Sequence, residues 1–340
     1  MLFRLPPEIV SALSDVSFAS VGDIITFTVL VTDADVDDPV ESLTYTFDFG
    51  DGAPLQNGSP DAEGNIEITH TYIDDGNYNA FLTISDGEAA SVRSEDISIQ
   101  IGEASQLPVT TGLVFQVESF TKIGNNGTIV TEWLDQSGFG NNLLAAGDPQ
   151  LVSNATPTGQ AAIVLDGDGD YLFRENPTGT ELEGLSVGNE PRTMFFVVDY
   201  EDVTNNEYAG LSYGTGAKNK AFGLTLEGSE DDLSIQGWGG ANDKATDVDG
   251  VVDGNAQQRG FISHAVTFDG STYKHYLNRV EIDSGTHTYN TQLERLVLGQ
   301  NLDGGGETPM SIAAAFIYNR ALTENEFDAV EDYVQQNYLQ

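Results

Sequence analysis

Most of the chain alternates between hydrophobic and polar residues in short runs, which is the pattern of β-strands with one buried face. In the N-terminal part, clusters of Asp, Gly, Asn and Pro separate five such runs, at residues 24–31, 43–49, 66–72, 78–85 and 94–101. Similar runs follow after residue 110, for example at 193–200 and 263–269. The pattern therefore predicts an all-β fold class.

Two breaks in this pattern organise the chain. Residues 103–109 lack periodicity and contain Pro108, so we interpret them as a linker between one domain at 1–102 and a second at 110–340. Near the C-terminus, Thr323 and Glu326 have the spacing of a capping box. Apolar residues then recur every three or four positions, which predicts one short amphipathic helix that closes the second domain. They are Phe327, Val330, Tyr333, Val334 and Tyr338.

Composition narrows the partners. The 340 residues include no cysteine, so disulfides and thiolate chemistry are excluded. The net charge of −41, from 54 acidic and 13 basic residues, makes nucleic acids and anionic membranes poor partners and is typical of marine or halophilic proteins. No run approaches a membrane span, and residues 1–12 lack the apolar stretch of a signal peptide. We expect a monomeric fragment of a larger secreted polypeptide.

The N-terminal domain resembles a known family in three motifs. Residues 47–52 read Phe-Asp-Phe-Gly-Asp-Gly, and His-Thr-Tyr at 70–72 and Gly-Asn-Tyr at 76–78 follow. This order resembles the PKD domain. The resemblance implies an immunoglobulin-like sandwich that serves as a spacer or glycan-side accessory in secreted bacterial proteins. It places the protein outside the cell or on its surface.

The second domain resembles laminin-G-like, concanavalin A-like modules. The motifs occur in the usual order, at residues 133–142 (Trp-Leu-Asp-Gln-Ser-Gly-Phe-Gly-Asn-Asn), 165–172 (Leu-Asp-Gly-Asp-Gly-Asp-Tyr-Leu), 264–270, 276–282, 298–301 and 317–323. The resemblance implies a jelly-roll sandwich of two curved antiparallel sheets, whose concave face and loops commonly bind glycans.

Sugar binding requires a flat aromatic surface and a few well-placed polar groups. Trp238 is the best candidate, because the flanking glycines expose an indole at the end of a strand, although a buried core position is the alternative. Five further residues complete the predicted ligand site: Tyr208, Tyr213, Asn242, Asp243 and Lys244. Trp133 is expected to lie in the core.

Three acidic clusters place carboxylates at alternate positions, which is a spacing that calcium can use. The predicted metal ligands are Asp33, Asp35, Asp37, Asp166, Asp168, Asp170, Asp247 and Asp249. The clusters at 33–38 and 166–170 do not continue as EF-hand loops, so structural turns without an ion remain the alternative. Calcium is therefore the expected cofactor of a chain that has no disulfides to stabilise it.

Catalytic residues are not evident. Glu281-Ile-Asp283 is similar to the opening of the laminarinase-type glycosidase motif, but the second glutamate of that motif is absent here. A hairpin strand is the preferred interpretation of this segment. The four histidines have no metal-binding spacing. Retaining glycosidases need two carboxyl groups about 5 Å apart, and no local spacing predicts such a pair.

The sequence thus favours a non-catalytic carbohydrate-binding fragment that is stabilised by calcium and binds a polysaccharide or cell-surface glycan. A calcium-dependent adhesin or a structural spacer is the first alternative. A polysaccharide-degrading enzyme on a jelly-roll scaffold is the weaker one, because folding can bring distant carboxylates together.

Overall fold

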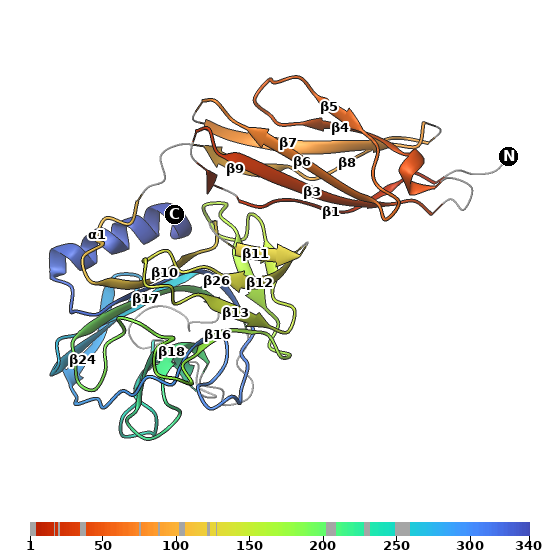
Figure 1. The fold of residues 1–340 in the computed structure, drawn as a ribbon. Coiled ribbons are helices and arrows are strands. Elements are labelled where there is room, and N and C mark those ends of the chain that lie inside the picture. The colour runs from red at the N-terminus through yellow and green to blue at the C-terminus, as the bar shows by residue number, and fades with distance from the viewer. Residues whose placement is uncertain are drawn as a thin grey trace. The chain divides into compact units, whose positions relative to one another are not determined.

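The computed structural model describes residues 5–16, 18–19, 21–34, 39–74, 76–87, 89–101, 106–120, 123–126, 128–201, 209–227, 232–248 and 259–340. The chain divides into two compact units, Met1–Gln106 and Leu107–Gln340. Leu107 and Val109, which the sequence analysis assigns to the linker, belong to the second unit, where the Tyr318 hydroxyl donates to the Val109 carbonyl at 2.9 Å. Both units are built from strands, which confirms the predicted all-β class (Figure 1).

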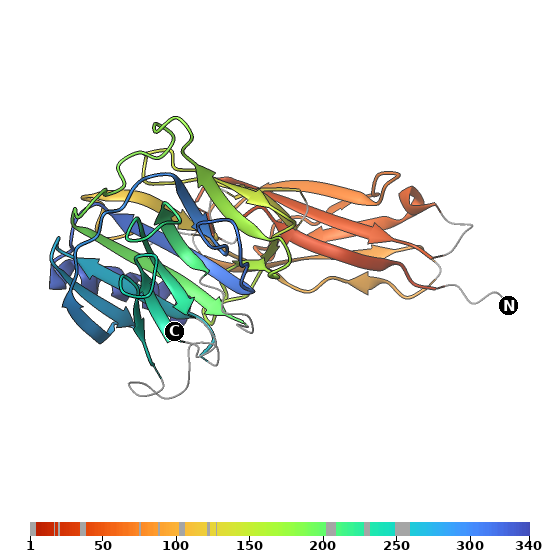
Figure 2. The same ribbon diagram turned by 90° about the horizontal axis from the view of Figure 1, so that it is seen from below.

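The first unit is a sandwich of a three-stranded and a six-stranded sheet, with strand orders β1-β3-β6 and β2-β9-β7-β4-β5, and β8 pairs with β7. In Figure 2 its red to orange strands run alongside one another. Its elements are β1 (Glu8–Ser14), β2 (Phe18–Ala19), β3 (Ile24–Thr32), the 3-10 turn η1 (Val40–Ser42), β4 (Thr44–Asp48), β5 (Gln56–Gly58), β6 (Asn65–Thr71), β7 (Gly76–Ser85), β8 (Val92–Arg93) and β9 (Ile97–Ile101).

Two of the three sequence motifs of this unit, residues 47–52 and 70–72, pack against each other. The Tyr72 hydroxyl donates to the Phe49 carbonyl at 2.8 Å, and the His70 ring stacks on Phe49 with centroids 3.9 Å apart. His70 also bonds through Nε2 to the Asp51 carboxylate at 2.7 Å. The turn after β4 is thereby fixed to β6 in the opposite sheet, so these residues hold the sandwich together.

The second unit contains most of the strands and the only α-helix of the described residues. Its strands are β10 (Leu113–Glu118), β11 (Ile123–Asn126), β12 (Ile129–Trp133), β13 (Leu143–Ala146), β14 (Gln150–Val152), β15 (Ala162–Leu165), β16 (Tyr171–Glu175), β17 (Arg192–Tyr200), β18 (Gly210–Gly214), β19 (Ala221–Glu227), β20 (Asp232–Gln236), β21 (Lys244–Thr246), β22 (Ile262–Phe268), β23 (Thr272–Leu277), β24 (Val280–Thr286), β25 (Arg295–Leu298) and β26 (Met310–Tyr318). The chain ends with α1 (Glu324–Val334) and the π-turn η4 (Gln335–Leu339).

The strand pairings form one continuous ladder that folds into two facing layers. In the first layer, β26 pairs with β17, β10 and β15, and the sheet continues from β17 through β22 and β23 to β24. In the second layer the order runs from β13 through β16, β25, β18, β19 and β20 to β21. The layers join where Ile129 of β12 pairs with Gln150 of β14.

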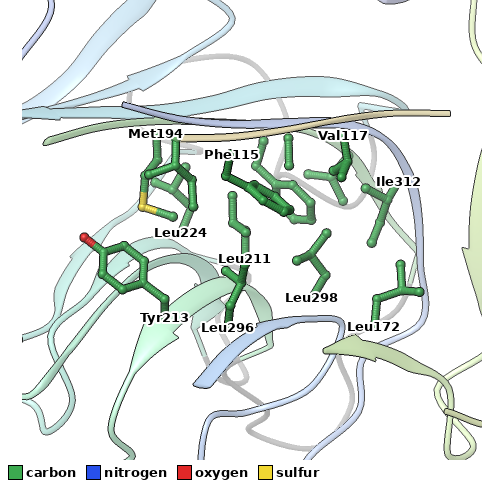
Figure 3. Packing of buried hydrophobic residues seen from close by; sticks show 14 of the residues in the cluster. Phe115, Val117, Leu172, Met194, Leu211, Tyr213, Leu224, Leu296, Leu298 and Ile312 are labelled. Atoms are coloured by element: carbon green, nitrogen blue, oxygen red, sulfur yellow. The ribbon is translucent and has the colours of Figure 1, made fainter. Parts of the chain in front are cut away.

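A single hydrophobic core fills the space between these layers (Figure 3). Phe115, Val117 and Met194 enter it from the first layer, and Leu211 and Leu298 from the second. Trp133 is also fully buried there, as the sequence predicted. Because strands alternate their side chains, every second residue of the second layer points away from this core.

The helix α1 begins at the predicted capping box, in which Thr323 and Glu326 satisfy each other's backbone N–H groups. It lies on the outer face of the first layer (Figure 1). Phe327 stacks on Phe195 of β17, with ring centroids 5.0 Å apart, and meets Tyr276 of β23 in a tilted contact at 4.2 Å. Across the described residues, no helix combines the length and the apolar character needed to span a membrane.

Two buried carboxyl groups lie under this C-terminal segment. Glu118 of β10 accepts hydrogen bonds from the hydroxyls of Tyr333 and Tyr338, each at 2.6 Å. Glu331 of α1 is fully buried and accepts one from the Ser263 hydroxyl at 2.6 Å, while its Oε2 has no partner. Burial raises the pKa of Glu118, and it raises the pKa of Glu331 to about 7.

We expect Glu331→Gln to stabilise the second unit at pH 8. A carboxyl group whose pKa is higher in the folded state stabilises that state most at low pH and loses the contribution as pH rises from about 4.5 to 7. The loss for Glu331 is on the order of 3 kcal/mol, and the amide carries no charge to bury. Thermal melts should show a higher midpoint for the variant at pH 8 and no gain at pH 4.5. The exposed Glu324→Gln on the same helix is the control, and an equal gain at both pH values would contradict the prediction.

Candidate functional site

A groove of about 280 Å³ opens on the outward face of the second layer, at the end of β20. On β19 and β20, Leu224, Leu226, Leu233 and Ile235 point into the core, so the intervening residues point outward. The groove is lined by Glu227, Gln236, Trp238, Gly239, Gly240, Asp243 and Asn301. It therefore combines one large aromatic side chain with amides and carboxylates.

The Trp238 indole is held in a fixed place. The loop after β20 is pinned by Asp243, whose Oδ1 accepts the backbone N–H of Gly237 at 2.8 Å and of Trp238 at 2.7 Å. Trp238 has a φ of 70°, a left-handed conformation that these bonds impose on a non-glycine residue. Its half-buried ring packs against a small apolar cluster of Ala221, Val297 and Leu302. An aromatic surface that is already ordered loses little entropy when a ligand binds.

The amides of the groove are oriented by their neighbours. The Ser212 hydroxyl donates to Gln236 Oε1 at 2.9 Å, and Gln236 Nε2 donates to Asn301 Oδ1 at 3.5 Å. The backbone N–H of Leu302 donates to the same Asn301 oxygen at 3.0 Å. These contacts fix which ends of the two amides face the groove.

Glu227 is the least satisfied polar group of the groove. Its Oε2 is buried and has no hydrogen-bond partner. Burial raises the pKa of Glu227, the Ser234 hydroxyl opposes that rise, and the charges of Asp243 and Asp232 add to it. Two residues earlier on the same face of β19, the fully buried Thr225 also has a hydroxyl without a partner. This strand face thus carries hydrogen-bonding capacity that the protein itself does not use.

The structure brings together only part of the predicted ligand site. Trp238 and Asp243 line the groove as predicted. Asn242 is buried and donates to the Trp238 carbonyl at 3.1 Å, and Lys244 Nζ donates to the Ala241 carbonyl at 3.0 Å, so both support the loop without lining the groove. Tyr208 lies outside the described residues.

The prediction for Tyr213 was wrong. Its side chain is fully buried between the layers, and its hydroxyl donates to the Ser186 carbonyl at 3.1 Å. Tyr213 lies two residues after the core residue Leu211 on β18, and side chains two residues apart lie on the same face of a strand. The alternation therefore directs Tyr213 away from the groove.

Three lining residues were missed by the sequence analysis: Glu227, Gln236 and Asn301. For Gln236 a signal existed, because it alternates with Leu233 and Ile235 and immediately precedes the Gly-Trp turn. Glu227 and Asn301 come from β19 and from the segment after β25, and no local pattern connects these elements to Trp238.

The carboxylates of the Asp166–Asp170 turn bond to the backbone of the turn and its neighbour. Asp170 is buried, and its Oδ1 accepts the backbone N–H of Asp148 at 2.7 Å, while Asp166 Oδ1 accepts that of Asp168 at 2.8 Å. The carboxylates cap the backbone of the turn, and the predicted metal role of this cluster is not supported. Within the described part of the chain, no group of three or more His, Asp or Glu residues could hold a metal.

Of the other predicted metal ligands, the structure describes only Asp33 and Asp247. Asp33 is half-buried after β3, and Asp247 is exposed after β21. Asp35, Asp37 and Asp249 lie outside the described residues. Calcium binding in these two loops stays a prediction.

The Glu281-Ile-Asp283 segment forms a hairpin strand, as preferred from the sequence. It belongs to β24, which pairs with β23. Glu281 forms an ion pair with Lys274 at 3.3 Å, and Asp283 accepts the Tyr273 hydroxyl at 2.9 Å. Both carboxylates thus stabilise the hairpin.

Comparison with known families identifies the first unit. Residues 6–101 match the PKD domain family. The match confirms the resemblance predicted from residues 47–52, 70–72 and 76–78. No curated protein matches the chain.

Three solved structures illustrate what the fold is similar to. The binding domain of Paraclostridial Mosquitocidal Protein 1 is 16% identical with a TM-score of 0.46, and the match covers 65% of this chain and 51% of that one. The botulinum neurotoxin serotype D ligand-binding domain in complex with N-acetylneuraminic acid is 12% identical with a TM-score of 0.47, covering 66% and 52%. Domain 4 of AbnA, a GH43 extracellular arabinanase from Geobacillus stearothermophilus, in complex with arabinotriose, is 19% identical with a TM-score of 0.41, covering 65% and 97%. The chain spans about half of the first two structures.

Proposed function

We propose that the second unit is a non-catalytic carbohydrate-binding module and that the Trp238 groove is its ligand site. The observation that carries this proposal is the half-buried indole, which the loop 237–243 holds in place beside oriented amides and carboxylates. Sugar rings present flat C–H faces and rims of hydroxyl groups. An indole packs against a C–H face, and the side chains of Gln236, Asn301 and Glu227 can form hydrogen bonds with the hydroxyl groups.

The finer assignments are part of the same proposal. The module is laminin-G-like, it acts outside the cell on a polysaccharide or cell-surface glycan, and calcium stabilises loops such as that after Thr246. The PKD domain supports this context as a spacer that carries the module away from its parent protein. A calcium-dependent adhesin or a structural spacer is the second candidate, favoured by the acidic surface, with its net charge of −41.

We expect Trp238→Ala to abolish or weaken glycan binding by about tenfold or more, because buried aromatic contacts dominate binding energy. The test is a glycan array with the labelled full chain, read in calcium and again in chelator, followed by titration of each hit. Alanine adopts the left-handed backbone of this position about as readily as tryptophan does, so the loop is preserved.

Phe139→Ala is the matched control. Phe139 is an aromatic residue of the same unit, flanked by Gly138 and Gly140, and its side chain is 41% exposed. It does not line the groove. Hits that the Trp238 variant loses and the Phe139 variant keeps would support the proposal. A blank array, or hits that survive Trp238→Ala, would move the function to the adhesin or spacer alternative.

A further inference from the structure

The charge of the Trp238 groove is one-sided. Its described lining contains two carboxylates, Glu227 and Asp243, and no lysine, arginine or histidine. The neighbouring lysines are not part of this lining. Lys244 Nζ is bound to the Ala241 carbonyl, and Lys218 passes Gly239 without lining the groove. The groove thus presents negative charge beside an aromatic face.

Glu227 is the centre of this negative charge and lines the groove. Its Oε2 is buried without a hydrogen-bond partner, and Asp243 and Asp232 add negative charge around it. Like charges held this close are unfavourable, and a cation bound in the groove would offset them.

A protonated amine suits this arrangement better than a hydroxyl does. Ammonium groups form charge-assisted hydrogen bonds with carboxylates, which are about twice as strong as neutral ones. They are also attracted to the face of a tryptophan. A carboxylated or sulfated sugar would instead place like charges together, because no cation lines the described groove.

We propose that the Trp238 groove prefers a cationic amino sugar, a hexosamine unit with a free protonated amine, over neutral and acidic sugars. This inference rests on the proposed function of the groove. Glu227 is the specificity-determining residue, and Trp238 supplies the surface against which any sugar ring packs.

The experiment is isothermal titration of the full chain with three β-1,4-linked tetramers that differ only at carbon 2, those of glucosamine, N-acetylglucosamine and glucose. At pH 6 and 150 mM NaCl we expect the glucosamine tetramer to bind at least about tenfold more tightly than the other two. Glu227→Gln keeps the shape of the side chain and removes its charge, so it should bring the affinity for the glucosamine tetramer down to that for the two neutral tetramers. The exposed Glu294→Gln, immediately before β25 and outside the groove, should keep the preference.

A chain of net charge −41 attracts polycations without a site, so Trp238→Ala is a necessary second variant. Glucosamine binding that survives both Trp238→Ala and Glu227→Gln is non-specific attraction and overturns the inference. Equal Trp238-dependent binding of all three tetramers overturns it while the proposed function stands. If none of the tetramers binds but glycans on the array bind through Trp238, the preference for amino sugars is again refuted. The proposed carbohydrate-binding function stands in that case. If nothing binds in either assay, both proposals fail.

Discussion

Replacing Arg192 by lysine is expected to lower the free energy of unfolding of the second unit by about 3 to 5 kcal/mol. Arg192 is fully buried at the start of β17 and has no carboxylate partner among the described ion pairs. Its guanidinium donates to the carbonyls of Gly188 and Glu190, each at 2.9 Å, and to the hydroxyls of Tyr213 and Thr291, each at 2.9 Å. The charge is therefore stabilised by fixed dipoles.

Aromatic faces complete this environment. The guanidinium lies 4.8 Å from the centroid of the Phe222 ring and 5.8 Å from that of Phe268. Lysine would keep a buried charge at this place but would offer three donors from one point, where arginine offers five in a planar fork. Several carbonyl and hydroxyl groups would lose their donor, and the turn that precedes β17 would lose its attachment to the core.

Urea unfolding followed by tryptophan fluorescence measures this effect in the full chain. Both tryptophans, Trp133 and Trp238, belong to the second unit, so the signal reports that unit alone. Arg279→Lys is the control, because Arg279 binds Asp328 and Asp332 on the surface and its replacement should change stability by less than about 1 kcal/mol. If both variants show the same small loss of unfolding free energy, the stabilising role assigned to Arg192 is wrong.

The parts of the fold that the sequence predicted are those coded by neighbouring residues. The capping box of Thr323 and Glu326 determines where α1 begins, and no distant residue is needed to see it. The alternation in residues 193–200 predicts a strand, which the structure shows as β17. In the first unit, the strands β1, β2, β5 and β8 were missed. Three of them, β2, β5 and β8, have only two or three residues, which cannot show a period.

The site was predicted less completely, for a physical reason. Trp238 stands out because glycines flank it, and Asp243 is close in sequence. Glu227 and Asn301 reach the groove only through the register of β19 with β20 and through the segment after β25. Register depends on the whole sheet. The same limit hid Arg192, whose partners come from the preceding turn, from β18 and from residue 291.

The second large effect expected is acid destabilisation through a buried histidine pair. His264 and His275 are fully buried on neighbouring strands, and their Nε2 atoms are 2.7 Å apart. His264 Nδ1 contacts the Tyr200 hydroxyl at 3.2 Å, and His275 Nδ1 contacts the Thr246 hydroxyl at 3.1 Å. The two hydroxyls and the two rings thus form one hydrogen-bonded chain. When both rings are neutral, each N–H or O–H that points along this chain can meet one acceptor. Two protonated rings would place two N–H donors face to face.

Burial lowers the pKa of His275 to about 3, and burial together with His275 lowers that of His264 well below its ordinary value. For a base whose folded pKa is depressed, the stability is fully present above the unfolded pKa of about 6.5 and is lost as pH falls toward the folded value. Between pH 7 and pH 5 the pair should lower the free energy of unfolding by roughly 4 kcal/mol, since each histidine contributes up to 1.36 kcal/mol per pH unit. Glu331 acts in the opposite direction over the same range, so the wild-type curve alone understates the effect.

The comparison that isolates the pair is between the chain and its double variant His264→Gln/His275→Gln. We expect the variant to be less stable at pH 8, because packing is disturbed, and to lose much less further stability between pH 7 and pH 5 than the wild type. The readout is the pH slope of the unfolding free energy from tryptophan fluorescence, which does not depend on the absolute stability of the variant. His287→Gln, at a half-buried position, should keep most of the wild-type slope. Equal slopes for the wild type and the double variant would show that the buried pair takes up no proton on unfolding, contrary to its burial.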